Sequence, residues 1–107
     1  MKASVCAWKP NIDVWYDRDQ FGEYLKVRFY TYNNSNFFTK ISGKVYCRGT
    51  SRLLFSEASV GNGFAETSWG LLPIPPDCGE YYAQGDAITA VQAYSDDWVW
   101  AYGSYPA

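Results

Sequence analysis

The stretch Tyr24-Leu25-Lys26-Val27-Arg28-Phe29-Tyr30-Thr31-Tyr32 decides the fold class, because its apolar and polar residues alternate with a period of two. Side chains two residues apart share one face of an extended strand. One face therefore carries Leu25, Val27, Phe29 and Thr31, whereas the other carries basic and tyrosine side chains. This alternation predicts a β-strand with one buried face and one polar face.

The segment Thr39–Arg48 repeats this design. Its inner face carries Ile41, Gly43, Val45 and Cys47, and its outer face is again basic. We expect the two strands to pair as a hairpin, because antiparallel neighbours in sequence are joined by a short turn. Their outer faces would then form one cationic surface that also bears tyrosines.

Further strands and turns follow on both sides of this pair. Strands are expected at Ser4–Trp8, Ile12–Tyr16, Leu53–Val60, Phe64–Leu72 and Asp96–Tyr105, with a tight turn at Gly61-Asn62-Gly63. Asp86–Tyr94 fits either a short helix or a strand, and its β-branched residues favour the strand. About seven to eight short strands predict an all-β fold, an antiparallel β-sandwich of Ig-like or jelly-roll style. We expect a single domain over residues 1–107.

Charge is divided unevenly along the chain. Residues 1–52 carry all nine basic residues and a net charge of +5, whereas residues 53–107 carry seven acids, no base and a net charge of −7. We expect the two halves to attract one another. The overall charge of −2 opposes the phosphate attraction on which nucleic-acid binding depends, so no nucleic-acid partner is expected.

Three cysteines allow one disulfide and leave one thiol over. We favour Cys47–Cys78, because Cys47 ends a strand and Cys78 lies in a turn-rich stretch. Pairing of Cys6 with either one, or three reduced thiols in a cytoplasmic protein, remains open. The aromatic-rich, lysine-poor composition favours a secreted or extracellular protein. No run of residues approaches the length of a membrane span.

The residue types argue against catalysis. The chain contains no histidine, so neither a Ser-His-Asp nor a Cys-His arrangement can form. No zinc or phosphate-binding motif occurs. Paired carboxylates can cleave glycosidic bonds, but a domain of this size rarely forms the cleft that such chemistry needs. We expect no enzyme activity, no cofactor and no metal.

The last predicted strand carries the candidate ligand site. It places Trp98, Trp100 and Tyr102 on one face, headed by Asp96 and Asp97. This ladder is either core packing or a platform on which sugar rings stack, and burial of apolar area favours at least partial covering of both strand faces. In size, strand number and aromatic richness the chain resembles small β-sandwich carbohydrate-binding modules. A glycan-binding function is therefore the first expectation.

Two alternatives involve protein partners. The proline-rich segment Leu71–Cys78 is expected to lack regular pairing and to be stiffened by its prolines. As a rigid loop of an inhibitor or toxin-like protein, it would present Leu72, Pro73, Ile74 and Pro75 to a partner. Alternatively, the aromatic residues would form contacts in a larger assembly, as oligomer interfaces often do.

Overall fold

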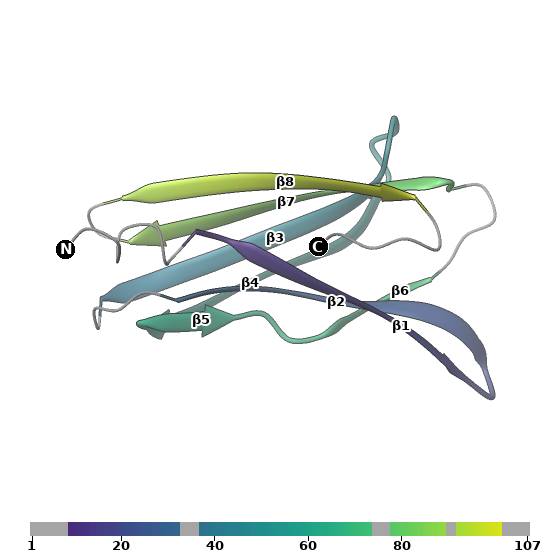
Figure 1. The fold of residues 1–107 in the computed structure, drawn as a ribbon, viewed down its shortest axis with the longest axis horizontal. Coiled ribbons are helices and arrows are strands. Elements are labelled where there is room, and N and C mark those ends of the chain that lie inside the picture. Colours follow the sequence, from purple (N-terminus) through teal and green to yellow (C-terminus); the bar gives the residue numbers. More distant parts are fainter. Residues whose placement is uncertain (1–8, 33–36, 74–77, 90–91, 102–107) are drawn as a thin grey trace.

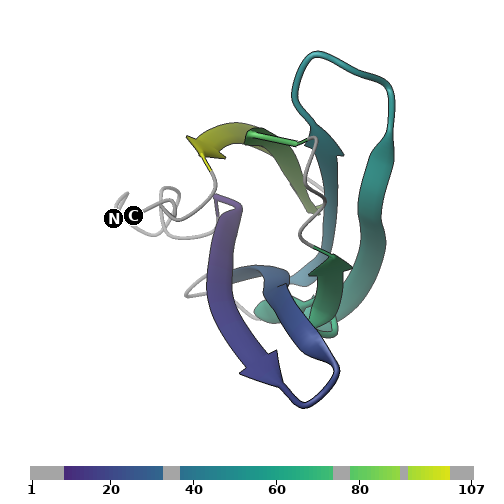
Figure 2. The ribbon, with the colours of Figure 1, turned by 90° about the vertical axis from the view of Figure 1, so that its right-hand side faces the viewer.

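The computed structural model describes residues 9–32, 37–73, 78–89 and 92–101, and within these ranges it contains eight β-strands and no helix (Figure 1). Sheet A comprises β1 (Asn11–Asp19), β2 (Gly22–Tyr32), β5 (Phe64–Glu66) and β6 (Gly70–Pro73). Sheet B comprises β3 (Phe38–Cys47), β4 (Leu53–Asn62), β7 (Glu80–Thr89) and β8 (Ala93–Ala101). All strand pairs are antiparallel, and the end-on view in Figure 2 shows the sheets curving around a common interior. The predicted β-sandwich is confirmed. The strand expected at Ser4–Trp8 lies outside the described residues.

Strand β2 is the centre of sheet A. It pairs with β1 along one edge, whereas β5 and β6 share its other edge. Leu25, Val27, Phe29 and Thr31 are fully buried, as the alternation predicts. These side chains face the inner row of β3, where Ile41 and Val45 are also buried. The core therefore lies between the two sheets and draws on both alternating strands.

The predicted hairpin between Tyr24–Tyr32 and Thr39–Arg48 is wrong. In the structure β2 belongs to sheet A, whereas β3 lies in sheet B between β4 and β7. The physical reason is that both strands have a full apolar face to bury, and placing them in opposite sheets lets these faces pack on each other. Their basic outer faces consequently point in opposite directions, and no joint cationic surface forms.

Phe29 locks the two sheets together. Gly43 of β3 lies directly opposite Gly85 of β7, and the Phe29 ring occupies the space above this pair. A Cβ atom at Gly43 would overlap that ring, and one at Gly85 would come within 3.1 Å of it. The ring also packs at 6.0 Å from the rings of Phe55 and Trp98. Two glycines in mid-strand thus make room for the largest fully buried side chain of the opposite sheet.

The expected disulfide between Cys47 and Cys78 is confirmed. It joins the end of β3 to the segment before β7, with a Cα–Cα distance of 5.8 Å, and both cysteines are buried. An ion pair between Arg48 and Glu80 (3.3 Å) lies nearby and links the basic half of the chain to the acidic half.

Loss of this disulfide is expected to lower stability substantially. It closes a loop with a sequence separation of 31, for which chain entropy in the unfolded state accounts for roughly 3–4 kcal/mol. The Cys47→Ala/Cys78→Ala variant should show this decrease in the free energy of unfolding in urea. An unchanged denaturation midpoint would show that the cross-link does not restrict the unfolded chain.

In the segment Asp86–Tyr94, the residues up to Thr89 belong to β7, as the β-branched residues indicate, and Ala93 and Tyr94 belong to β8. Two hydrogen bonds join Thr89 and Gln92: Thr89 N–H donates to the Gln92 carbonyl (2.8 Å), and Gln92 N–H donates to Thr89 Oγ1 (3.2 Å). The strand itself is longer than predicted, because β7 already begins at Glu80.

Candidate functional site

The tryptophan ladder of β8 faces the interior. Trp100 is only 4 % exposed, and its ring stacks on Tyr81 at 5.3 Å. Trp98 is half-buried and meets Phe29 edge to face. Val99, whose side chain points to the other face of β8, is exposed. The tryptophans occupy the inward face of β8 because this arrangement buries the larger apolar area. Tyr102 lies outside the described residues.

The two aspartates at the head of the ladder are on opposite faces of β8, because neighbouring side chains alternate in a strand. Asp96 lies on the inner row and lines a groove together with Trp98. Asp97 points outward and accepts a hydrogen bond from the Tyr82 hydroxyl (3.1 Å). That hydrogen bond raises the pKa of Tyr82. The four described residues of the predicted site therefore do not form a single surface: of these four, only Asp96 and Trp98 meet at the groove.

The proline-rich segment is more regular than expected. Leu71, Leu72 and Pro73 belong to β6 and pair with Lys26, Leu25 and Tyr24 of β2. The expectation that residues 71–78 lack regular pairing is thus wrong for 71–73. Leu72 is fully buried, because strand pairing turns it toward the core, so it offers no contact to a partner. Ile74 and Pro75 lie outside the described residues.

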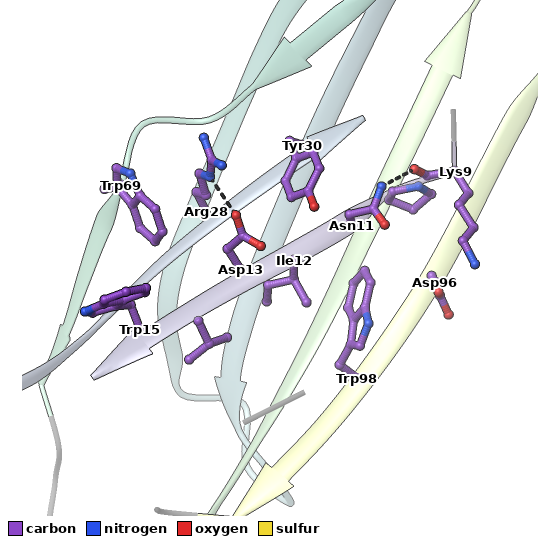
Figure 3. A pocket seen from close by; sticks show the side chains of 12 residues that line it. Lys9, Asn11, Ile12, Asp13, Trp15, Arg28, Tyr30, Trp69, Asp96 and Trp98 are labelled. Carbon is purple, nitrogen blue, oxygen red and sulfur yellow. Dashed lines mark hydrogen bonds and ion pairs between the residues drawn. The ribbon is translucent and has the colours of Figure 1, made fainter. Parts of the chain in front are cut away.

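A groove with aromatic walls runs along the edge strand β1 (Figure 3). It has a volume of about 530 Å³, within the range usual for ligand sites. Figure 3 shows Trp69, Arg28 and Tyr30 in a row on one side of β1, and Trp98 of β8 on the other. We call this feature the aromatic groove and define it by Trp15, Arg28, Tyr30, Trp69 and Trp98.

The strand register builds one wall of this groove. Trp15 is paired with Lys26, Asp13 with Arg28, and Asn11 with Tyr30 across β1 and β2. In β1, Ile12 is buried on the core side, so Asp13 and Trp15 point away from the core. The Trp15 side chain is 64 % exposed, which is a large apolar area to leave in water.

Arg28 is the centre of the wall. Its Nε donates to Asp13 Oδ2 (2.9 Å), and its Nη1 forms an ion pair with Glu66 of β5. The guanidinium carbon lies 5.1 Å from the ring centroids of both Tyr30 and Trp69. Cation–π attraction therefore holds an aromatic ring on each side of the arginine. The result is a fixed row of two rings and one guanidinium, with two carboxylates beside it.

Trp69 reaches this row because the edge strand is interrupted. The predicted strand Phe64–Leu72 is split into β5 and β6, which pair with different ends of β2. At the break, Thr67 N–H donates to the Phe29 carbonyl (2.8 Å), and Phe29 N–H donates to Thr67 Oγ1 (3.0 Å). The Thr67 hydroxyl thus takes the place of a backbone carbonyl as the acceptor of one hydrogen bond between the strands. The chain leaves the sheet for two residues after it, and Trp69 is 44 % exposed there.

Replacement of Thr67 by valine is expected to destabilise the protein and to displace Trp69. Valine has nearly the same shape but leaves the buried Phe29 N–H without its acceptor, at a cost of about 1–3 kcal/mol. Thr67→Ser keeps the acceptor and is the matched control. Urea denaturation of both variants checks this; equal losses in both would show that shape, not the hydrogen bond, holds the break.

A second hollow continues the groove beyond Trp15 and Trp69. It is open, has a volume of about 390 Å³, and is lined by these two rings and Lys26. The Lys26 ammonium lies 3.4 Å from Asp17 Oδ2. The backbone N–H of Arg18, which donates to Asp17 (2.8 Å), lowers the pKa of the Asp17 carboxyl, and Lys26 adds to this effect. The two tryptophans therefore line two adjoining hollows.

Tyr30 supplies a neutral hydroxyl to the groove. Burial of its ring raises the pKa of the Tyr30 phenol, and the nearby Asp13 charge raises it further. The phenol is therefore protonated throughout the neutral range and can donate a hydrogen bond. With the carboxylate of Asp13 as an acceptor, the wall offers both hydrogen-bond partners that a hydroxyl group needs.

The groove combines flat apolar rings with donors and acceptors at their edges. Trp15, Trp69, Arg28 and Asp13 were not among the residues that the sequence singled out for a site. Within the described ranges, no group of three or more potential metal-ligating side chains comes together, and no helix is long and apolar enough to cross a membrane. Comparison of the chain with protein-family models, with curated proteins and with solved structures finds no match.

Proposed function

We propose that this protein is a non-catalytic binding domain that holds a carbohydrate in the aromatic groove. The observation that carries the proposal is the exposure of Trp15 and Trp69, which lie together at one end of the fixed row of polar groups. Sugar rings have apolar C–H faces that pack on indole rings, and their hydroxyls both donate and accept hydrogen bonds.

Preorganisation supports this proposal. Arg28 is already held by two carboxylates and two rings, so little side-chain entropy remains to be lost when a ligand binds. Apart from Trp69, which lies in the short break between β5 and β6, the residues that define the groove lie on paired strands. Trp98 forms the far wall and remains partly accessible, so of the ladder it is Trp98, with Asp96, that takes part in binding.

The location proposed for the protein is extracellular. The Cys47–Cys78 disulfide is of the kind that persists in oxidising environments and is rare in the cytosol. Small domains in such environments commonly rely on a disulfide to supplement a limited core. An extracellular domain would also encounter polysaccharides directly.

A glycan array followed by titration tests the proposal. Soluble oligosaccharides and insoluble polysaccharides such as cellulose, xylan and chitin serve as probes, and tryptophan fluorescence reports binding. We expect at least one glycan to bind and to quench or shift the emission. Absence of binding to the entire array and to the insoluble polysaccharides would overturn the proposal.

The affinity for the glycan is expected to be constant between about pH 6 and 9. The chain has no histidine, and the pKa of Tyr30 is raised above its ordinary value of 10.0, so the phenol keeps its proton in this range. On the alkaline side, binding should weaken as the pH rises past this raised pKa, when the donor is lost. Titrations at several pH values check this. A several-fold change in affinity near pH 7 would mean that another group controls binding.

An assembly role has one supporting observation. On the outer face of sheet B, Val60 and Ile88 flank Lys40 on the neighbouring strands, Phe38 lies two residues before Lys40 on β3, and all three apolar side chains are exposed. Such a cluster suits a contact between protein chains. Sedimentation equilibrium would detect self-association, and the Phe38→Ala variant would reduce it.

A further inference from the structure

The charges around the aromatic groove compensate one another. Arg28 is paired with Asp13 and Glu66, and Lys26 with Asp17. The remaining charged groups of the described lining are Lys9 and Asp96. Counting the direct ion-pair partners, three cations thus stand against four carboxylates. An anionic ligand would gain little from this surface, although the surface contains an arginine at its centre.

Arg28 nevertheless has donors to offer. A guanidinium carries five N–H groups, of which the Nε donor is used by Asp13 and an Nη1 donor by Glu66. A sugar hydroxyl can accept from the remaining donors and donate to Asp13 without disturbing either ion pair. A sugar carboxylate or sulfate at the same place would bring its charge beside Asp13 and Glu66, where like charges repel.

Glu66 occupies a special position in this arrangement. It belongs to β5, opposite Tyr30, and it does not line the aromatic groove. Its effect on a ligand therefore passes through Arg28, with which it forms an ion pair outside the lining of the groove. Removal of the Glu66 charge would leave the lining intact and would change the net charge of Arg28 with its two carboxylate partners from −1 to zero, so that the cluster would no longer repel an anionic ligand.

We propose that the aromatic groove selects neutral glycans over anionic ones, and that Glu66 sets this selectivity by adding a second carboxylate to the Arg28–Asp13 pair and so giving it a net negative charge. This inference rests on the proposed glycan-binding function and specifies the chemical class of its ligand. Glu66 acts as a positioning and specificity residue, because it acts through Arg28 and not through contact with the ligand.

Matched pairs of oligosaccharides test the selectivity. Each pair has the same linkage and length, one member neutral and the other with carboxylates at C6: oligomers of glucose, mannose and galactose against the corresponding uronic acids. Calorimetric titration of the wild-type protein should give an affinity about tenfold or more higher for the neutral member of the pair that binds. The affinity for that neutral member should not depend on salt, because no net charge is involved.

The Glu66→Gln variant should shift the affinity ratio toward the uronic acid by about fivefold, as expected for one partly exposed charge. Glu80→Gln is the matched control, because it removes a similar arginine partner from sheet B, away from the groove. If a uronic acid binds the wild type as well as its neutral counterpart does, or if Glu66→Gln leaves the ratio unchanged, the inference is overturned while glycan binding stands. If no member of any pair and no insoluble polysaccharide binds, the proposed function fails and the inference with it.

Discussion

Replacement of Trp15 or Trp69 by alanine is expected to abolish most of the glycan affinity without unfolding the protein. Both rings are exposed and line the groove, and both remain outside the hydrophobic core. Truncation of an aromatic residue at the centre of a binding surface typically costs about 2 kcal/mol or more. The dissociation constant should therefore rise roughly 30-fold for either variant.

The matched control for these variants is Phe38→Ala. Phe38 is 60 % exposed, close to the exposure of Trp15, but it lies on the outer face of sheet B. The glycan affinity of this variant should equal that of the wild type, and all three variants should unfold at nearly the same urea concentration. If Trp15→Ala and Trp69→Ala bind as tightly as Phe38→Ala does, the aromatic groove is not the binding site.

Replacement of Trp100 by alanine is expected to destabilise the fold strongly. The indole is buried between the sheets and stacks on Tyr81, so its removal leaves a large cavity as well as losing apolar contacts. Losses of about 3–5 kcal/mol are typical for a buried tryptophan. Urea denaturation measures this value directly.

Val99→Ala is the control for this substitution. Val99 precedes Trp100 in β8 but faces outward and is exposed, so its truncation should cost well under about 1 kcal/mol. A Trp100→Ala variant as stable as Val99→Ala would show that the ladder is not part of the core. Strong destabilisation by Trp100→Ala, in contrast, explains why this tryptophan is unsuitable as a stacking platform.

The strands with a complete apolar row could be predicted from the sequence. In Tyr24–Tyr32 and Thr39–Arg48 every second residue is apolar or small, and the buried faces agree with the structure. Strand β7 was harder to recognise because its inner row contains Ala83, Gly85 and Ala87, which carry little hydrophobic signal. At Gly85 a side chain would meet the rings of Phe29 from β2 and Trp98 from β8, which fill the space above this position. Such compensation between sheets is not visible in the local pattern.

Sheet assignment and the candidate site depend on tertiary structure in the same way. Alternation shows that a strand has an apolar face but not which other strand that face meets, so β2 and β3 could not be separated in advance. Trp15 did carry a signal, because it alternates with Asp13 and Asp17 on the polar face of its strand. Trp69 gave no such signal in the sequence, because its exposure results from the interruption between β5 and β6, where Thr67 bonds to Phe29.

The most direct test of the binding site is an NMR titration of the indole N–H groups with the best-binding oligosaccharide. The chain has five tryptophans, so their signals can be assigned one by one from substitutions. We predict that the Trp15 and Trp69 signals shift progressively to saturation, whereas the Trp100 signal stays unchanged. Saturable binding that leaves Trp15 and Trp69 unmoved would contradict the account and place the glycan on another surface.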